Sequence, residues 1–140
     1  MLLGRKNPLI TTIEQLADNG MESLGKYYSM HRAFVFDNAD PLSVNRLLLI
    51  VPDIAGMEPY TLWAHPRNNY FGKDYGMQII PNKGDMVWVE FEGGNPEIPV
   101  WSHGHPGTEE RNNDPELKDI KTYWFKSPNG NMVVINDTKN

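Results

Sequence analysis

Two histidines, His103 and His105, stand one glycine apart and have the types and spacing of a metal-binding pair. In an extended segment, residues i and i+2 point to the same side, so both imidazoles could face one ion. No Asp, Glu or His stands beside them at convincing ligand spacing, although remote residues could converge. We therefore favour exposed loop histidines, keep a metal site as the weaker alternative, and expect no cofactor.

Glu90, Glu92 and Glu97 are the other groups that could do chemistry, as acid–base carboxylates. A glycosidase places two carboxyl groups about 5–9 Å apart across a sugar cleft. Glu90 and Glu92 would share a strand face near the lower limit, but any alternating strand gives that spacing. Solvated surface charges explain them better. The sequence has no defensible Ser-His-Asp order, phosphate-binding glycine loop or HExxH helix, so we predict that the protein is not an enzyme.

The histidines and glutamates lie in residues 83–106, which predict two strands joined by a Gly-Gly-Asn-Pro turn. Bulky residues occupy nearly every position from Met86 to Phe91, so both faces of the first strand are loaded. Such a strand is typical of a closed barrel, or of a sheet that also contacts another chain.

Alternation along the strands separates an inner set of side chains from an outer set. The residues expected to pack inside are Phe34, Phe36, Leu48, Ile50, Val87, Val89, Phe91 and Val100. The candidates for the opposite face, and for contact with another subunit, are Met86, Trp88 and Trp101. Core or subunit contact is favoured over ligand stacking for the tryptophans, because binding a single strand would also need a cationic groove.

Composition and charge narrow the class of protein. A chain of 140 residues with 39% hydrophobic and 22% charged residues has the size and balance of one globular domain. A net charge of −5, with Lys and Arg scattered singly, argues against nucleic-acid binding. The absence of cysteine excludes a disulfide scaffold and a Cys-ligated zinc site. The longest apolar run, residues 47–51, is too short to span a membrane, and no secretory signal is predicted.

The periodicity changes along the chain and predicts its elements. Residues 11–24 have a helical pattern, which begins with a Thr11–Glu14 capping box and is interrupted at Asn19-Gly20. A polar linker at residues 104–121 precedes two strands around Asn129-Gly130, a tight-hairpin signal. The other predicted segments are strands at residues 28–36, 46–51, 77–80, 84–92 and 98–103, with a long loop at residues 53–75.

Five short strands with Gly and Pro corners predict an all-β fold, a five-stranded Greek-key barrel of the OB type. A short N-terminal helix and a C-terminal β-hairpin extension would flank it. A β-sandwich stays open on pattern alone. The predicted domains are an N-terminal helical arm at residues 1–26, the barrel at residues 27–106, and a linker with C-terminal strands at residues 107–140.

Several strand-and-turn motifs occur in a specific order. They are residues 27–36 with the turn Asp37-Asn38-Ala39-Asp40-Pro41, residues 46–52, Trp63-Ala64, residues 76–85, residues 87–99 and residues 127–138. This series resembles the OB-fold domain of phage baseplate central-spike proteins, which is related to the OB domain of type VI secretion spike proteins. The resemblance covers roughly residues 27–138. It departs at Asn45, where the family usually has Gly, and it leaves out the N-terminal helix.

The resemblance implies a structural subunit of the baseplate hub or central spike of a contractile phage tail or related injection system. It implies a homotrimer in the virion, made in the host cytoplasm, with tail hub and tube proteins and a spike or lysin protein as partners. Residues 107–140 would lead towards the spike, and the N-terminal helix would dock on the hub or cap its own barrel. A β-helix shaft or lytic domain is expected on another chain or beyond Asn140.

No nucleic-acid partner and no stable membrane association are expected. Two alternative functions stay open. One is an OB-fold module that binds single-stranded nucleic acid or a glycan, and the other is the N-terminal part of a tail lysin.

Overall fold

The computed structural model of the chain describes residues 7–110 and 112–138. They fall into two compact units, Met1–His105 and Pro106–Asn140, whose folds are described separately. The first six residues of the predicted N-terminal arm lie outside the described residues, as do the last two of the predicted C-terminal segment. The three-part division into arm, barrel and C-terminal strands stays a prediction.

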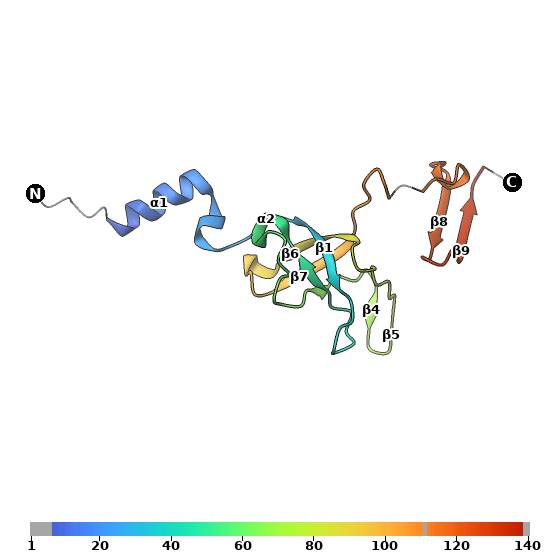
Figure 1. The fold of residues 1–140 in the computed structure, drawn as a ribbon, viewed down its shortest axis with the longest axis horizontal. Helices are drawn as coiled ribbons and strands as arrows, with labels where there is room; N and C mark the ends of the chain where they lie inside the picture. The colour runs from blue at the N-terminus through green and yellow to red at the C-terminus, as the bar shows by residue number, and fades with distance from the viewer. Residues whose placement is uncertain (1–6, 111, 139–140) are drawn as a thin grey trace, which may run out of the picture. The chain divides into compact units, whose positions relative to one another are not determined.

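Five strands of the first unit form one mixed sheet in the order β2-β1-β6-β7-β3 (Figure 1). Neighbouring strands are antiparallel except β3 and β7, which run parallel. The predicted β architecture, with an N-terminal helix and a C-terminal hairpin, is confirmed. The five strands are β1 His31–Asp37, β2 Leu48–Ile50, β3 His65–Pro66, β6 Met86–Phe91 and β7 Pro99–Gly104.

A bridge between Leu47 and Ala64 connects the two edges of this sheet. The Leu47 amide donates to the Ala64 carbonyl at 3.0 Å, and the Ala64 amide donates to the Leu47 carbonyl at 2.8 Å. Leu47 directly precedes β2 and Ala64 directly precedes β3, the strands at opposite edges. The sheet is therefore curved into a half-barrel, and this bridge links the chain segments next to its two edge strands.

The core lies on the concave side of the half-barrel. Along β6 the predicted alternation is confirmed, because Val87, Val89 and Phe91 are buried while Met86, Trp88 and Glu90 are half-exposed. The buried residues of the core cluster are Ala33, Val35, Leu47, Leu49, Val51, Ala64, Val87, Val89, Phe91 and Trp101.

The predicted inner face was wrong on β1, β2 and β7. Five predicted core residues are exposed or half-exposed, namely Phe34, Phe36, Leu48, Ile50 and Val100. Alternation shows which residues share a face, but a shift of one residue reverses inside and outside when both faces are apolar. Trp101 follows the same reversal: it lies opposite Val89 in the register and is 4% exposed, so it belongs to the core.

The predicted strand at residues 77–80 is absent from the described structure, and β3 occupies the sheet edge instead. A two-residue strand that contains Pro66 has no readable alternation, which explains why the pattern missed it. The predicted long loop at residues 53–75 also contains most of a short helix and a second hairpin. These are α2 Pro52–Ala55 and the paired strands β4 Phe71–Gly72 and β5 Tyr75–Gly76.

Helix α1 spans Pro8–Asn19 and begins earlier than the predicted capping box at Thr11. The Asn7 side chain accepts a 3.0 Å hydrogen bond from the Leu9 amide and so caps the first turn. Pro8 fits the first helical position, where a missing N–H leaves no hydrogen bond unmade. The residues of α1 are all outside the core, since none is buried.

The predicted interruption at Asn19-Gly20 is confirmed. Gly20 adopts φ 68° and ends α1, after which the chain continues as the 3-10 helix η1 Met21–Leu24. Within residues 7–110 and 112–138, no helix is long and apolar enough to cross a membrane.

The second unit is built on the hairpin of β8 Thr122–Lys126 and β9 Met132–Asn136, which confirms the prediction around Asn129-Gly130. The linker also contains the 3-10 helix η3 Glu116–Lys118, which the composition did not predict. Its Leu117 is buried, and the Leu117 carbonyl accepts a 3.1 Å hydrogen bond from Trp124 Nε1. One face of the hairpin is therefore supported by the linker.

Candidate functional site

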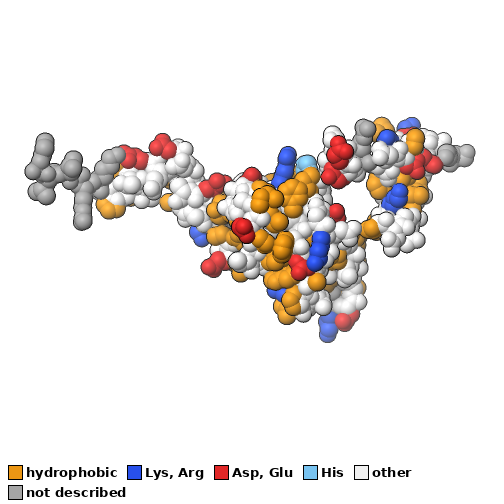
Figure 2. Space-filling view, in the orientation of Figure 1, with side chains coloured by type: hydrophobic (Ala, Val, Ile, Leu, Met, Phe, Trp, Pro, Cys, Tyr) orange, Lys and Arg blue, Asp and Glu red, His pale blue; other side chains and the backbone are white. Residues whose placement is uncertain are grey.

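The outer surface of β1 and β6 carries a groove of about 550 Å³, which we call the Trp88 groove. The antiparallel register places Arg32 opposite Trp88 and Phe34 opposite Met86, so these four side chains share one face. Figure 2 shows hydrophobic side chains at the surface of the barrel, among basic and acidic groups. The residues that line the groove are Met30, Arg32, Phe34, Pro52, Asp53, Met86 and Trp88.

Arg32 and His105 lie beside the indole of Trp88. The Arg32 guanidinium lies 5.9 Å from the ring centroid, within cation–π range. The His105 ring stands edge-on to Trp88, with 4.9 Å between centroids. Asp53 lies on the same rim, and its carboxylate is 3.8 Å from Nδ1 of His31. An apolar floor with a polar rim is the composition of a protein–protein contact.

The two histidines weighed as a metal pair have different partners. His103 is exposed, with Nε2 3.4 Å from Oδ1 of Asn69. His105 packs against Trp88, and its Nδ1 is buried without a hydrogen-bond partner. Among the described residues, no group of three or more His, Cys, Asp or Glu could hold a metal ion. The structure thus gives His105 a place beside the groove and provides no third ligand for the pair within that part of the chain.

The three glutamates do not form the pattern of an acid–base pair. Glu90 makes an ion pair with the Arg67 guanidinium. Glu92 lies outside β6, at the start of the 3-10 helix η2 Glu92–Gly94, so the expected alternation with Glu90 ends before it. Both line a shallow hollow of about 380 Å³, and Glu97 is exposed. The arrangement is that of surface carboxylates, one of which is engaged by a cation.

Sequence reasoning missed the role of Asp40, which organises the loop before β2. Its carboxylate accepts hydrogen bonds from the backbone amides of Leu42, Val44 and Arg46 at 2.9–3.1 Å. The Arg46 guanidinium donates two more, at 2.7 and 3.0 Å. These bonds, the Arg46 side chain foremost, hold the pKa of Asp40 well below its ordinary value of 3.8. The Asp-Pro turn followed by an arginine was the available signal.

The five-stranded half-barrel sheet, whose edge strands are linked through the Leu47–Ala64 bridge, defines a mostly β, barrel-like domain. Residues 31–105 match the family described as the type VI secretion system/phage-baseplate injector OB domain. The match covers more than half of the chain and begins with β1. The chain therefore belongs to this family. The comparison with curated proteins returned no match.

Membership confirms the resemblance that the ordered motifs indicated. The family consists of structural baseplate domains that are generally non-enzymatic, and it implies a location in the virion tail with other baseplate proteins as partners. The matched residues contain all five strands of the sheet and the strand residues of the Trp88 groove. Helix α1 and the β8–β9 hairpin lie outside them.

Proposed function

We propose that the chain is a structural subunit of the baseplate hub or central spike, where three copies connect the tail tube and hub to the membrane-piercing spike. Membership in the injector family supports the class of function. We further propose the trimer and its contacts with the tail tube, the hub and the spike. The role is mechanical: the barrel supplies a fixed body, and the exposed apolar surfaces on and beyond it supply contacts.

An exposed apolar face on the β8–β9 hairpin is the observation that supports a trimer. Tyr123 pairs with Ile135 and Phe125 pairs with Val133, so these four side chains share one face. Each is 52–64% exposed. An isolated two-stranded hairpin is marginally stable in water, and a contiguous apolar face marks a contact site. Three copies around one axis would bury three such faces against one another.

Light scattering of the full chain tests the trimer. The expected mass is three times 16.0 kDa. Phe125→Ser, on the apolar face, is expected to reduce the trimer to monomers. Lys126→Ser is the control, because Lys126 is the next residue and points to the opposite face. A monomeric wild-type chain that binds an oligonucleotide or a glycan would overturn the proposal in favour of a ligand-binding module.

A further inference from the structure

The β4–β5 hairpin is an aromatic wedge, defined by Tyr70, Phe71 and Tyr75 on a two-stranded ribbon. Tyr75 lies over Gly72, and a Cβ atom at Gly72 would collide with the Tyr75 ring. Phe71 lies over Gly76 in the same way, where a Cβ atom would come within 2.8 Å of Phe71 Cδ2. Because Gly72 and Gly76 stand on opposite faces of the ribbon, the two rings coat both sides of it.

The rings of the wedge are exposed yet held in place. Tyr70, Phe71 and Tyr75 are 58–66% exposed, and the Tyr70 and Tyr75 ring centroids are 5.4 Å apart. The base of the hairpin is fixed to the barrel, because the Arg67 amide donates a 2.8 Å hydrogen bond to the Trp101 carbonyl. The hairpin projects from the barrel in Figure 1. A two-stranded ribbon with ordered aromatic rings on both faces has a shape that can insert into a groove on a protein surface.

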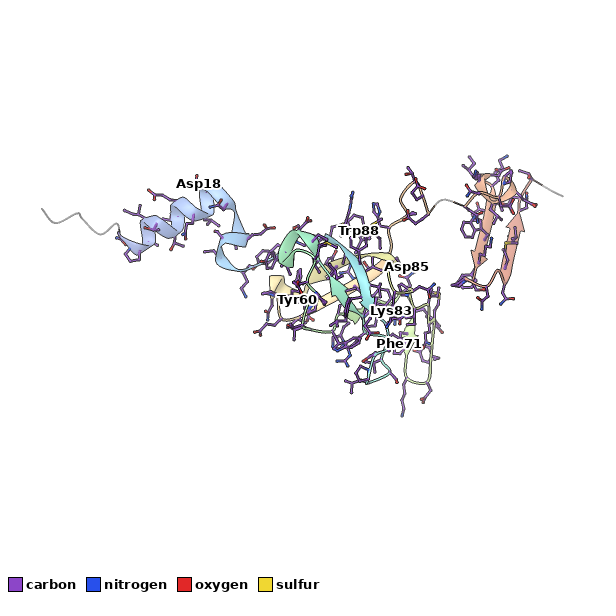
Figure 3. All side chains as sticks on the ribbon, viewed as in Figure 1. Asp18, Tyr60, Phe71, Lys83, Asp85 and Trp88 are labelled. Atoms are coloured by element: carbon purple, nitrogen blue, oxygen red, sulfur yellow. The ribbon has the colours of Figure 1, made fainter. Side chains whose placement is uncertain are left out.

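The Trp88 groove is chemically complementary to this wedge. Met30 and Met86 offer thioether sulfurs, which pack favourably against aromatic rings, and Arg32 offers a guanidinium for cation–π contact. The tip of the wedge carries Lys73 and Asp74 between its strands, and the lining of the groove carries Asp53 and Arg32, so each charge of the tip has an opposite charge in the groove. Trp88 and Phe71 lie at separate places on the same unit in Figure 3.

We propose that the wedge of one copy docks into the Trp88 groove of a neighbouring copy. The proposal rests on the trimer proposed above and names one of its contacts. In a ring of identical subunits, each contact joins two different patches of the same protein. Every copy offers one wedge and one groove, so three copies can close a ring in which neither patch remains exposed to water. Lys73 of one copy would then face Asp53 of the next.

Disulfide cross-linking tests this contact, and the chain has no cysteine to interfere. The double variant Asp53→Cys/Lys73→Cys is oxidised as the full chain and run on a non-reducing gel. The expected result is a covalent trimer, because each copy would be bonded to both neighbours. An equimolar mixture of the two single variants is expected to give covalent dimers. The control pair replaces Asp53 with the exposed Glu97, as Glu97→Cys/Lys73→Cys, and is expected to remain largely uncross-linked.

Light scattering on the same samples separates the two proposals. A trimer whose Asp53→Cys/Lys73→Cys variant cross-links no better than the control pair overturns the wedge contact and leaves the trimer standing. A monomer at every concentration overturns the trimer and the wedge contact together. A second variant, Phe71→Ser, replaces an exposed ring and is expected to weaken the trimer measurably, with an unchanged folded circular dichroism spectrum.

Discussion

The indole Nε1 of Trp101 donates a 3.0 Å hydrogen bond to the backbone carbonyl of Asn45. Trp101 lies on β7 inside the core, whereas Asn45 lies in the loop before β2. The bond satisfies the one polar atom of the buried ring and ties a distant loop to the core. The loop that Asp40 organises is therefore also held by a side chain of β7, a strand that is not a neighbour of β2 in the sheet.

Replacing Trp101 tests this tie. Trp101→Phe is expected to lower the free energy of unfolding by about 1–3 kcal/mol, because the Asn45 carbonyl loses its donor. Trp101→Ala is expected to cost about 3–5 kcal/mol, since a large buried ring is removed. Urea unfolding followed by circular dichroism measures both. Trp88→Phe on the outer face is the control, and a loss there as large as for Trp101→Phe would contradict the assignment of the core.

The backbone of Asn45 predicts which substitutions the loop accepts. Asn45 has φ 64°, a left-handed conformation that Gly and Asn adopt more readily than other residues. Asn45→Gly is expected to leave stability nearly unchanged, because glycine adopts a positive φ without steric cost. Asn45→Ala is expected to cost about 1–2 kcal/mol. Thermal unfolding measures the difference, and equal melting temperatures for the two variants would contradict it.

Acid should weaken the fold through Asp40. Its pKa is lowered in the folded protein by the Arg46 guanidinium, so the unfolded chain binds more protons just below the ordinary value of 3.8. This contribution to stability is complete above that value and is lost as the pH falls towards the folded pKa. Asp37, whose pKa is lowered by its hydrogen bond with Lys83, acts with the same sign.

Melting temperatures between about pH 5 and about pH 2 check this expectation. Asp40→Asn is expected to lower the melting temperature at neutral pH and to reduce its further fall in acid. Asp74→Asn at the exposed tip of the wedge is the control, because it removes a carboxylate outside the loop that Asp40 organises. An Asp40→Asn variant with the full wild-type fall in acid would argue against Asp40 as the source.

The sequence predicted which side chains share a face of a strand better than it predicted which face is buried. Along β6 the buried set of Val87, Val89 and Phe91 was correct because a polar residue, Glu90, marks the outer face. Along β1 polar residues stand on both faces, because His31 is buried on the inner face and Arg32 is exposed on the outer face, so the pattern gives no single polar mark for the outside. The bulkier phenylalanines were placed inside, whereas the core takes the smaller Ala33 and Val35.

The candidate site was predictable only in part. Met86 and Trp88 were selected as outer residues because they alternate with a valine row. The rest of the Trp88 groove comes from residues that meet only when β1 pairs with β6 and α2 folds beside them, namely Met30, Arg32, Phe34, Pro52 and Asp53. The wedge escaped prediction for another reason: its strands are two residues long, and its order depends on rings lying over glycines.

Helix α1 should contribute little to the stability of the barrel. None of its residues is buried, although Leu9, Ile13 and Leu16 recur at helical spacing. Ile13→Ser is therefore expected to change the free energy of unfolding of the barrel by less than about 0.5 kcal/mol. Leu49→Ala in the core is the comparison, with an expected loss of about 2–5 kcal/mol. A large loss from Ile13→Ser would show that α1 packs on the barrel.

The bridge between Leu47 and Ala64 has a mechanical consequence. A lateral load on the half-barrel would act on the link between the two edges of its sheet. At the Leu47–Ala64 bridge this link is a pair of backbone hydrogen bonds. Both residues are fully shielded from solvent. Water cannot readily compete for those bonds, so spreading the half-barrel at this point would first require the surrounding apolar side chains to separate. The resistance of the Leu47–Ala64 bridge to a lateral load is thus determined by the apolar packing that excludes water from it.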